Sequence, residues 1–446
     1  MSMAGLAPGL LSSQLGGSVD RRDSLIPPAA SQSPRDVVRP ATPELLAAAL
    51  VEASEEGLAV TPQGGGVLMG LGHPPDRPFK VVETRALNRV LEYSPDDMTA
   101  TVEAGLTLAE FQQKLAAHGQ QVGLESPFPH RATIGGILST AVAGPHRMAF
   151  GLPRDQVIGI RVAHPDGLLT KAGGRVVKNV TGYDMAKLYV GSLGTLAVIV
   201  EATFKLGPLP PMSRTIFIGC GSLDEGLGLS QRIMEARLQV SACELLDAVT
   251  QARTPGADAV GRRRWLLAVE FSGNAAAVGR QTGEMAALAR EANGTMAEAS
   301  GTGAQSFWDA VRDKGRVFGE PALILRAQTL PTATGRIAAE LLRISNERGL
   351  LPATNLRPLS GTVYAHWTPT DIRQADAAAW ATIVNLIREA ARAEGGSLVV
   401  EDAPWTLSSA LDVWGPTPAA FGVMQRMKQQ FDPERLLNPG RFVGRL

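Results

Sequence analysis

The sequence predicts a two-domain α+β protein. The chain has 446 residues, about three times the length of a typical domain of ~150 residues. Short β-branched runs fill most of its first half, whereas strand-like runs alternate with alanine-rich helical runs in its second half. Between the two halves, the Gly-Pro-Leu-Pro-Pro segment at 207–211 is expected to break all regular structure. We therefore expect a tail at 1–36, a first domain at 37–210, a second domain at 211–404 and a C-terminal segment at 405–446.

The first domain shows clear helix and strand signals. Thr42 and Pro43 suit the N-cap and first position of a helix that Gly57 ends. Thr107 and Glu110 have the spacing of a capping box, which predicts a helix as far as His118. Strands are expected at 58–61, 79–83, 90–93, 99–103, 157–163, 168–171 and 196–206.

The second domain is expected to be α+β. Its predicted strands lie at 215–218, 265–271 and 322–327, and its predicted helices lie at 230–238, 275–291, 334–348 and 376–394. A last helix is expected near 418–431.

Composition and charge exclude several functional classes. The chain carries 43 Lys plus Arg and 43 Asp plus Glu, a zero balance that argues against a nucleic-acid binder or a polybasic membrane binder. No apolar run approaches the ~18 residues that cross a bilayer, and the N-terminus lacks the pattern of a signal peptide. We therefore expect the chain in the cytoplasm. Its two cysteines, Cys220 and Cys243, are too few for a four-cysteine zinc site or an iron–sulfur cluster.

Glycine clusters indicate a nucleotide site. They lie at 64–72, 135–136, 173–182 and 191–194. A glycine-rich turn after a strand lets backbone N–H groups converge on an anion, most often a pyrophosphate. The first cluster does not have the G-x-G-x-x-G spacing of a Rossmann fold, and the phosphate-loop pattern ending in Gly-Lys-Ser/Thr is absent. NAD bound in the Rossmann manner and ATP are therefore disfavoured.

Five segments in order resemble the flavin domain of the vanillyl-alcohol oxidase superfamily, the PCMH-type FAD-binding fold. They read Pro-Gln-Gly-Gly-Gly-Val at 62–67, Ala-Thr-Ile-Gly-Gly at 132–136, Lys-Asn-Val-Thr-Gly-Tyr-Asp at 178–184, Gly-Ser-Leu-Gly-Thr-Leu at 191–196, and an ending with Phe-Asp-Pro at 431–433 and Leu-Asn-Pro-Gly at 437–440. The resemblance implies a two-part FAD-binding domain, a second α+β cap domain for the substrate, and a C-terminal segment that returns to the FAD domain.

The resemblance also implies the residues that bind FAD. They are Pro62, Gln63, Gly64, Gly65, Gly66, Val67, Thr133, Ile134, Gly135, Gly136, Tyr183, Asp184, Gly194 and Thr195. Asn438 is expected chiefly to stabilise the C-terminal turn. Some relatives tether the flavin through a histidine of the first loop, but Val67 has no nucleophilic atom, so we expect non-covalent FAD. His73, followed by two prolines, is expected in a surface loop.

Within this superfamily the chain resembles the FAD-binding subunits of glycolate oxidase (glycolate dehydrogenase). That family implies oxidation of glycolate, a 2-hydroxy acid, to glyoxylate, together with a catalytic flavoprotein subunit and an iron–sulfur subunit. Membrane attachment, at the inner membrane, would then come only through these partners. The His-Gly-Asp-Gly-Asn type of segment found in catalytic relatives is absent, so we assign no catalytic residue and no metal ligand. His366, alone among aromatic residues, is expected to be structural.

Two alternatives remain open. One is a self-sufficient FAD dehydrogenase of another hydroxy acid, alcohol or lactone; the other is a non-catalytic scaffold that keeps the flavin fold. A hydroxy-acid oxidase needs a cation for the substrate carboxylate, and Arg326 and Arg357 are candidates that nothing in the sequence selects. With two distant cysteines, any electrons taken from a substrate must pass to oxygen, a quinone, another flavin or a partner's iron–sulfur centre.

Overall fold

Two small sheets form the core of the first domain in the computed structural model, which describes residues 34–175, 182–320 and 322–446. The first is parallel, with strand order β1-β3-β2, and helix α2 covers it. The second is antiparallel, with strand order β4-β5-β9-β7-β8. The strands are β1 (Asp36–Val38), β2 (Ala59–Gln63), β3 (Phe79–Glu83), β4 (Val90–Ser94), β5 (Thr99–Glu103), β7 (Val157–Ala163), β8 (Leu169–Gly173) and β9 (Val198–Lys205).

The helices of the first domain begin where the sequence places capping residues. Thr42 accepts a hydrogen bond from the Leu45 amide at the start of α2 (Pro43–Glu55), and Thr107 and Glu110 form the expected capping box of α3 (Leu108–Ala116). Four further helices are short: α4 (Ile134–Thr140), α5 (Arg147–Phe150), α6 (Pro153–Gln156) and α7 (Ala186–Tyr189).

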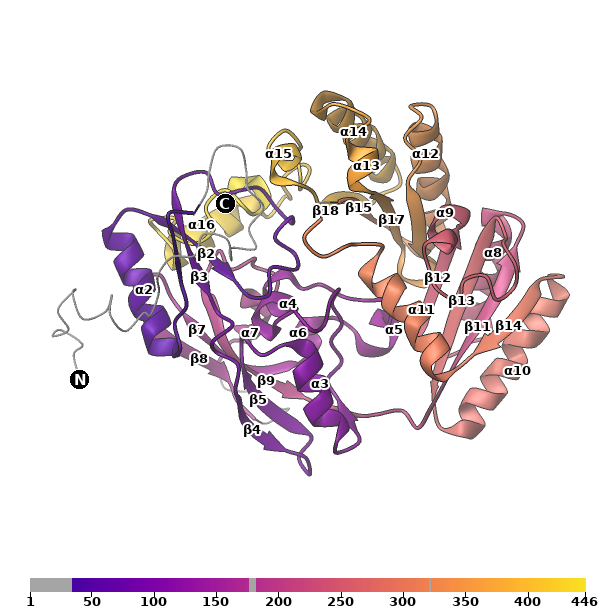
Figure 1. Ribbon diagram of the computed structural model, residues 1–446, viewed down its shortest axis with the longest axis horizontal. Coiled ribbons are helices and arrows are strands. Elements are labelled where there is room, and N and C mark those ends of the chain that lie inside the picture. Colours follow the sequence, from indigo (N-terminus) through magenta and orange to yellow (C-terminus); the bar gives the residue numbers. More distant parts are fainter. Residues whose placement is uncertain (1–33, 176–181, 321) are drawn as a thin grey trace.

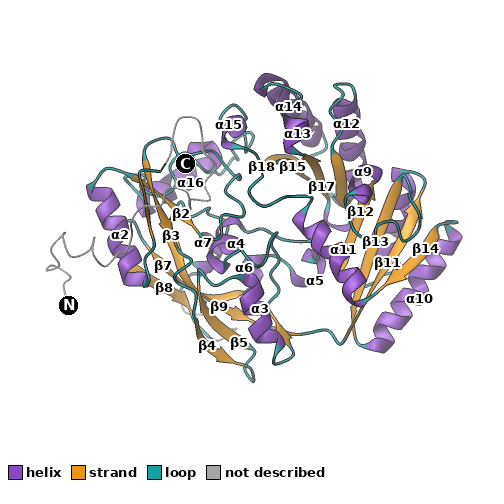
Figure 2. Cartoon of the chain, viewed as in Figure 1, coloured by secondary structure: helices purple, strands orange, loops and turns teal. Residues whose placement is uncertain are grey.

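One eight-stranded antiparallel sheet organises the second domain, as Figure 2 shows. Its order is β14-β11-β13-β12-β16-β17-β15-β18. The strands are β11 (Met212–Cys220), β12 (Ala242–Asp247), β13 (Trp265–Gly273), β14 (Thr295–Ala299), β15 (Leu323–Gln328), β16 (Ala353–Arg357), β17 (Thr362–Trp367) and β18 (Ser397–Asp402). The helices are α8 (Leu223–Glu235), α9 (Ala248–Ala252), α10 (Ala275–Glu291), α11 (Gly301–Asp313), α12 (Thr334–Asn346), α13 (Pro369–Ile372), α14 (Ala377–Ala393) and α15 (Trp405–Ser408), with 3₁₀ turns at Pro331–Ala333 and Pro358–Ser360.

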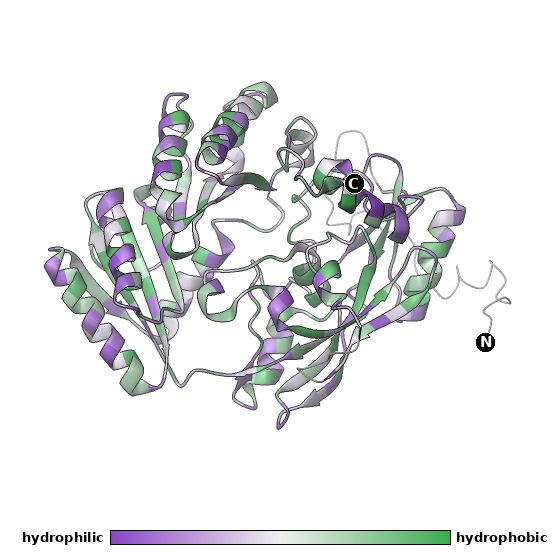
Figure 3. Ribbon diagram, turned by 180° about the vertical axis from the view of Figure 1, so that it is seen from behind, coloured by the Kyte–Doolittle hydropathy of each residue, from purple (hydrophilic) through white to green (hydrophobic). Residues whose placement is uncertain are grey.

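The two faces of this sheet differ in chemistry because side chains alternate along each strand. The outer face packs against α8, α10, α12 and α14 through a large apolar core, and Figure 3 shows that hydrophilic and hydrophobic residues alternate along the helices of this domain. The inner face carries charged and polar side chains, among them Glu244, Glu270, Asn355, Arg357 and Tyr364. These polar groups are largely buried, so each needs a partner.

The C-terminal segment runs back to the first domain, where α16 (Phe421–Phe431) lies near β2 in Figure 1. Trp405 packs edge-on against Phe79 and donates to the Met69 carbonyl at 3.0 Å. The Val60 amide donates to the Leu436 carbonyl, and the Asn438 amide donates to the Val60 carbonyl, both at 2.8 Å. A last 3₁₀ turn spans Val443–Arg445.

Several expectations about secondary structure were wrong. The helix expected at 230–238 is α8, which starts seven residues earlier at Leu223 because Ser222 caps it. The segment 207–211 is not free of regular structure, since β10 (Gly207–Pro208) pairs with β6 (Gln120–Gln121). Asp36, assigned to the tail, begins β1. Strand β12 was missed because its sequence, Ala-Cys-Glu-Leu-Leu-Asp, has no β-branched residue and no regular alternation of apolar and polar residues.

Among the described residues, no helix combines the length and the apolar character needed to cross a membrane.

Candidate functional site

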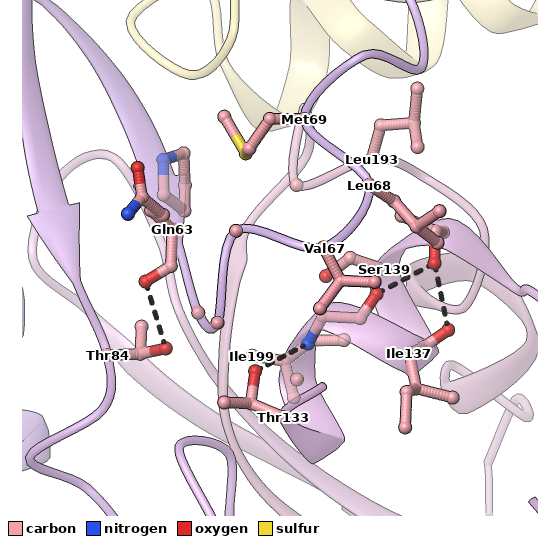
Figure 4. A pocket seen from close by; sticks show the side chains of 18 of the residues that line it. Gln63, Val67, Leu68, Met69, Thr84, Thr133, Ile137, Ser139, Leu193 and Ile199 are labelled. Atoms are coloured by element: carbon pink, nitrogen blue, oxygen red, sulfur yellow. Dashed lines mark hydrogen bonds between the residues drawn. The ribbon is translucent and has the colours of Figure 1, made fainter. Parts of the chain in front are cut away.

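A pocket in the first domain gathers most of the glycine clusters. The end of β2 and the loop that follows it, together residues 62–69, form one wall, and the start of α4 forms another. Figure 4 shows Val67 and Leu68 of this loop beside Thr133, Ile137 and Ser139. Residues 193–194 and the C-terminal segment complete the lining.

Close backbone approach explains the glycines of the loop. A Cβ atom on Gly64 would lie 2.0 Å from the Thr133 hydroxyl oxygen, and one on Gly65 would lie 1.7 Å from the Arg131 carbonyl oxygen. Gly66 has a φ of +72°, which favours glycine. Thr133 caps α4 by accepting from the Gly136 amide at 3.4 Å, so the loop packs against a helix start that is itself fixed. The result is a wall of backbone atoms on which a phosphate group can lie closely.

Buried polar side chains in the same pocket lack partners. Among the described residues, neither side-chain amide atom of Gln63 has a hydrogen-bond partner, nor do Asn438 Oδ1 and Arg441 Nη1. Arg441 makes no ion pair within the described part of the chain, and burial lowers the pKa of its guanidinium to about 10. It therefore remains a cation at neutral pH. A ligand that carries both anionic groups and ring donors and acceptors, as FAD does, fits this set.

Most of the predicted cofactor residues come together here. The pocket is lined by Pro62, Gln63, Gly64, Gly65, Gly66, Val67, Thr133, Gly135, Gly136 and Gly194. Ile134 lies in the adjoining apolar core, and Thr195 faces a neighbouring, more apolar pocket beside α16. Their contacts with FAD stay predictions.

Two predicted residues lie elsewhere. The Tyr183 side chain is 91% exposed, and Asp184 forms a surface ion pair with Lys187 at 2.9 Å. Neither lines the pocket. Residues 178–181 of the same motif lie outside the described residues.

His73 corrects another expectation. It is 3% exposed rather than in a surface loop, and its Nδ1 lies 3.1 Å from the Ser408 carbonyl oxygen. Burial lowers its pKa to about 4, so the ring is neutral at physiological pH. The two following prolines suggested exposure, but the returning C-terminal segment covers the loop.

Sequence reasoning missed several lining residues, above all Met69, Ser126 and Arg441. Arg441 follows directly on the Leu-Asn-Pro-Gly motif, and that adjacency was the available signal. Asn438, expected to stabilise a turn, does so with a φ of +44° and an Nδ2–Leu193 O bond of 2.7 Å, and it also lines the pocket.

The inner face of the second-domain sheet brings together the two arginines that the sequence did not select. Arg357 donates from Nε to Glu244 at 2.6 Å, and from Nη1 to the Tyr364 hydroxyl at 3.4 Å. Arg326 pairs with Glu401 at 3.0 Å. Tyr364 lies between their strands, paired with Arg326 in the sheet register. Arg357 also donates to the Ala143 carbonyl at 3.2 Å and so links the sheet to the first domain.

Arg147 of α5 approaches this group from the first domain. Among the described residues it makes no ion pair or side-chain hydrogen bond. Burial and the like charges of Arg357 and Arg326 lower its pKa, while Tyr364 opposes that effect. Arg147 is therefore a cation without a carboxylate partner, facing two cations whose carboxylates are already engaged.

A histidine bridges the domains beside α5. His146 Nδ1 lies 2.7 Å from Glu125 of the first domain, and Nε2 lies 3.0 Å from Glu270 on β13. Burial disfavours its charged form, but the two carboxylates override burial and raise its pKa to about 10. His146 is thus an imidazolium held between two acids. His366, by contrast, is buried and neutral, because burial and the Lys314 charge lower its pKa to about 3.

No group of three or more His, Cys, Asp or Glu side chains within the described ranges is arranged to hold a metal ion.

Comparison with known proteins identifies the two domains. Residues 34–173 match the family model described as "FAD binding domain", and residues 209–320 and 371–442 match "FAD linked oxidases, C-terminal domain". The chain is 24% identical to glycolate oxidase subunit GlcD of Bacillus subtilis over 92% of this chain and 89% of that protein. It is 34% identical to glycolate oxidase subunit GlcE of Escherichia coli over 34% of this chain and 44% of that protein.

A solved structure supports the same fold. That of p-cresol methylhydroxylase with substrate bound superposes with a TM-score of 0.73 and 15% identity, covering 96% of this chain and 92% of that one. The predicted α+β fold with a PCMH-type FAD-binding domain and a second α+β domain is therefore confirmed, and so is FAD as the cofactor. The chain belongs to the FAD-linked oxidases of the PCMH-type, or vanillyl-alcohol oxidase, superfamily and is an FAD-dependent oxidoreductase.

Proposed function

We propose that this chain is the FAD-binding subunit of a glycolate-oxidising complex, which converts glycolate to glyoxylate and passes the electrons to a partner subunit. Its similarity to GlcD over nearly the whole chain, and to GlcE over a third of it, supports this proposal. In the proposal the complex is cytoplasmic and reaches the inner membrane only through its partners.

The observation that carries the proposal is the position of Arg147. A 2-hydroxy acid is an anion at neutral pH, so its site needs a cation that is not already neutralised. Arg147 meets this need, since no carboxylate of the described residues pairs with it and its helix, α5, contacts β12 of the second-domain sheet. A guanidinium can hold a carboxylate through two parallel hydrogen bonds, which also fixes the orientation of the substrate.

The neighbouring residues hold this arrangement in place. Glu244 fixes Arg357, and Glu401 fixes Arg326, so both guanidinium groups keep one geometry on the sheet. The Arg357–Ala143 bond and the His146 bridge hold the first domain against the sheet. When bound, FAD supplies the two-electron acceptor for oxidation of the carbinol carbon. Arg147, Arg326 and Arg357 together bias the site toward small carboxylates.

The electron path supports a partner. An iron–sulfur cluster normally needs four thiolates, and this chain has two cysteines, both buried. We therefore propose that the electrons pass to an iron–sulfur subunit, in a complex that also contains a catalytic flavoprotein subunit.

The test uses the flavin-loaded full chain, alone and together with the chains that co-purify from the native host. Under anaerobic conditions, glycolate should bleach the flavin rapidly only in the complex, whereas the neutral analogue glycolamide should bleach it far more slowly. Arg147→Met should raise the glycolate concentration needed for half-maximal bleaching by about 10-fold or more. Arg290→Met, at an exposed arginine of α10, is the matched control and should behave as the unchanged chain.

Equal bleaching by glycolamide, or an unaltered response of Arg147→Met, would contradict the anion site. The arginine set within this chain favours one second candidate, a self-sufficient dehydrogenase of a hydroxy acid. Bleaching by glycolate or D-lactate at the full rate, with no partner present, would establish that alternative and show that this chain needs no partner subunit for oxidation.

A further inference from the structure

A cavity of about 930 Å³ lies in the second domain, away from the flavin pocket. It sits at one end of the inner face of the sheet, where β12 and β17 end and β16 begins. Helices α9, α11 and α13, which Figure 2 shows along this end of the sheet, enclose it together with residues 314–317, Glu320 and Ala322. No residue lines both this cavity and the flavin pocket.

The size of the cavity does not match glycolate. Its volume lies in the upper part of the range of ~300–1,000 Å³ that is usual for sites of small organic ligands and cofactors. A two-carbon acid would leave most of that space to water. The cavity therefore suits a larger molecule than the substrate proposed above.

Part of the cavity wall is apolar. Leu246 of β12 and Val311 of α11 belong to one buried cluster on the inner face, and Ala322 adjoins Tyr364 in another. Val317, in the enclosing segment, is 57% exposed. An apolar body about the size of a medium-length acyl chain or an aromatic ring can remove this surface from water.

A buried arginine in the wall keeps a free donor. Arg316 has a side chain only 3% exposed; its Nε donates to Asp402 at 3.1 Å and its Nη2 donates to Glu401 at 3.2 Å. Its Nη1 is buried and has no hydrogen-bond partner among the described residues. A buried donor without a partner costs about 1–3 kcal/mol, so an acceptor on a ligand would be favoured at this point.

Three further cations lie among the lining residues, of which Lys314 pairs with Glu401 and the other two have no carboxylate partner among the described residues. Arg253 at the end of α9 is exposed and makes no side-chain bond within the described part of the chain, and Arg373 bonds only to the Thr370 hydroxyl at 3.3 Å. The acidic lining residues are Asp313, which is engaged by Arg312 and the Phe128 amide, and Glu320. The unengaged charges of the lining are therefore mainly positive.

We propose that this cavity is a second ligand site, which binds an amphiphilic organic anion with a carboxylate or phosphate head and an apolar body larger than glycolate. The head pairs with Arg316 Nη1 and with Arg253, and the body lies against Leu246 and Val311. The lining of this cavity shares no residue with the flavin pocket, although Glu401 pairs both with Arg316 and with Arg326 of the proposed substrate site. The proposal does not depend on glycolate being the oxidised substrate.

Calorimetry with the full flavin-loaded chain tests this, using octanoate, octyl phosphate and 1-octanol as probes. One of the two anionic probes should bind with one-to-one stoichiometry, and which of them binds tighter decides between a carboxylate and a phosphate head. The neutral 1-octanol should bind at least about 10-fold more weakly, because it lacks the charge that Arg316 and Arg253 pair with.

Three variants locate the site. Arg316→Lys keeps the charge beside Glu401 and Asp402 but removes the free donor, and Ala310→Trp fills the cavity from α11 without changing charge. Arg253→Gln removes a cation at an exposed position, so it tests the site even where Arg316→Lys fails to fold. Each should weaken binding of the anionic probe about 5-fold or more, whereas Arg290→Gln, at an exposed arginine of α10 outside the cavity, should not.

Failure of both anionic probes to bind, equal binding of 1-octanol, or unchanged binding in both Ala310→Trp and Arg253→Gln would overturn the proposal. Competition between octanoate and glycolate would also overturn it, because the cavity would then belong to the substrate site. Binding is measured as heat, so a chain that does not oxidise glycolate still gives a decisive result.

Discussion

The flavin pocket and the inner face of the second-domain sheet differ in how they position polar groups. In the pocket, the backbone itself forms the wall, because Gly64 and Gly65 have no side chains. The loop can therefore pack onto the start of α4 at distances that no Cβ atom permits. On the sheet, the chain adds charged side chains and neutralises them in place, as Glu244 does for Arg357. The first surface is shaped by sterics and the second by electrostatics.

This difference explains what each surface tolerates. A backbone wall is sensitive to any added atom but carries no charge that must be balanced. A buried ion pair tolerates little change of charge, because loss of one partner leaves the other uncompensated in a medium of low dielectric. Variants in the two regions should therefore fail for different reasons and in different measurements.

The largest effect is expected on the sheet. Glu244→Leu leaves the Arg357 guanidinium, whose side chain is 5% exposed, without its carboxylate, and it also removes the acceptor for Asn355 Nδ2. The free energy of unfolding should fall by about 3–5 kcal/mol, measured by urea denaturation of the flavin-loaded chain. The double variant Glu244→Leu with Arg357→Met should recover a large part of this loss. A single variant as stable as the unchanged chain would mean that the pair does not organise the sheet.

The next effect is expected in the pocket. Gly65→Ala places a Cβ atom 1.7 Å from the Arg131 carbonyl oxygen, so the loop must move away from α4. The strain should cost about 1–3 kcal/mol, and the purified chain should lose most of its flavin, measured as the ratio of visible to ultraviolet absorption. Gly228→Ala is the control, because a Cβ there meets nothing within 4 Å. Full flavin content in Gly65→Ala would show that the cofactor does not depend on this close packing.

The junction of the two regions should respond to pH. The pKa of His146 is raised to about 10 in the folded chain by Glu125 and Glu270, against an ordinary value near 6.5. Its contribution to stability is therefore complete below about pH 6.5, decreases as the pH rises from there, and is gone above about pH 10. The midpoint temperature of thermal unfolding, measured from pH 6 to pH 10, should fall as this contribution is lost. In His146→Gln, the part of the fall that comes from the histidine should be absent. If the midpoint temperature depended on pH identically in the unchanged chain and in His146→Gln, the His146 bridge would carry no charge.

The same difference decides how much could be predicted from the sequence. The glycine loops could be found because steric exclusion restricts them to one residue type in short consecutive motifs, as at 62–67 and 132–136. The group around Arg357 could not, because Arg147, Arg326 and Arg357 lie on three separate elements, and many other arginines in the chain look alike. The fold was predictable where periodicity was clear, as in α10, which spans the expected 275–291. It was not predictable in β12, whose residues Ala-Cys-Glu-Leu-Leu-Asp include no β-branched side chain and do not alternate regularly between apolar and polar.

The smallest effect is expected at Tyr183, where motif and structure disagree. The motif at 178–184 assigns Tyr183 to the cofactor, yet its side chain is 91% exposed and does not line the flavin pocket. Tyr183→Ser should therefore change the free energy of unfolding by less than about 0.5 kcal/mol and leave the flavin content unaltered. The informative measurement is the rate of electron transfer within the complex, since an exposed aromatic ring is a typical contact for a partner protein. A slower rate with full flavin content would assign Tyr183 to partner contact, whereas loss of flavin would restore its assignment to the cofactor.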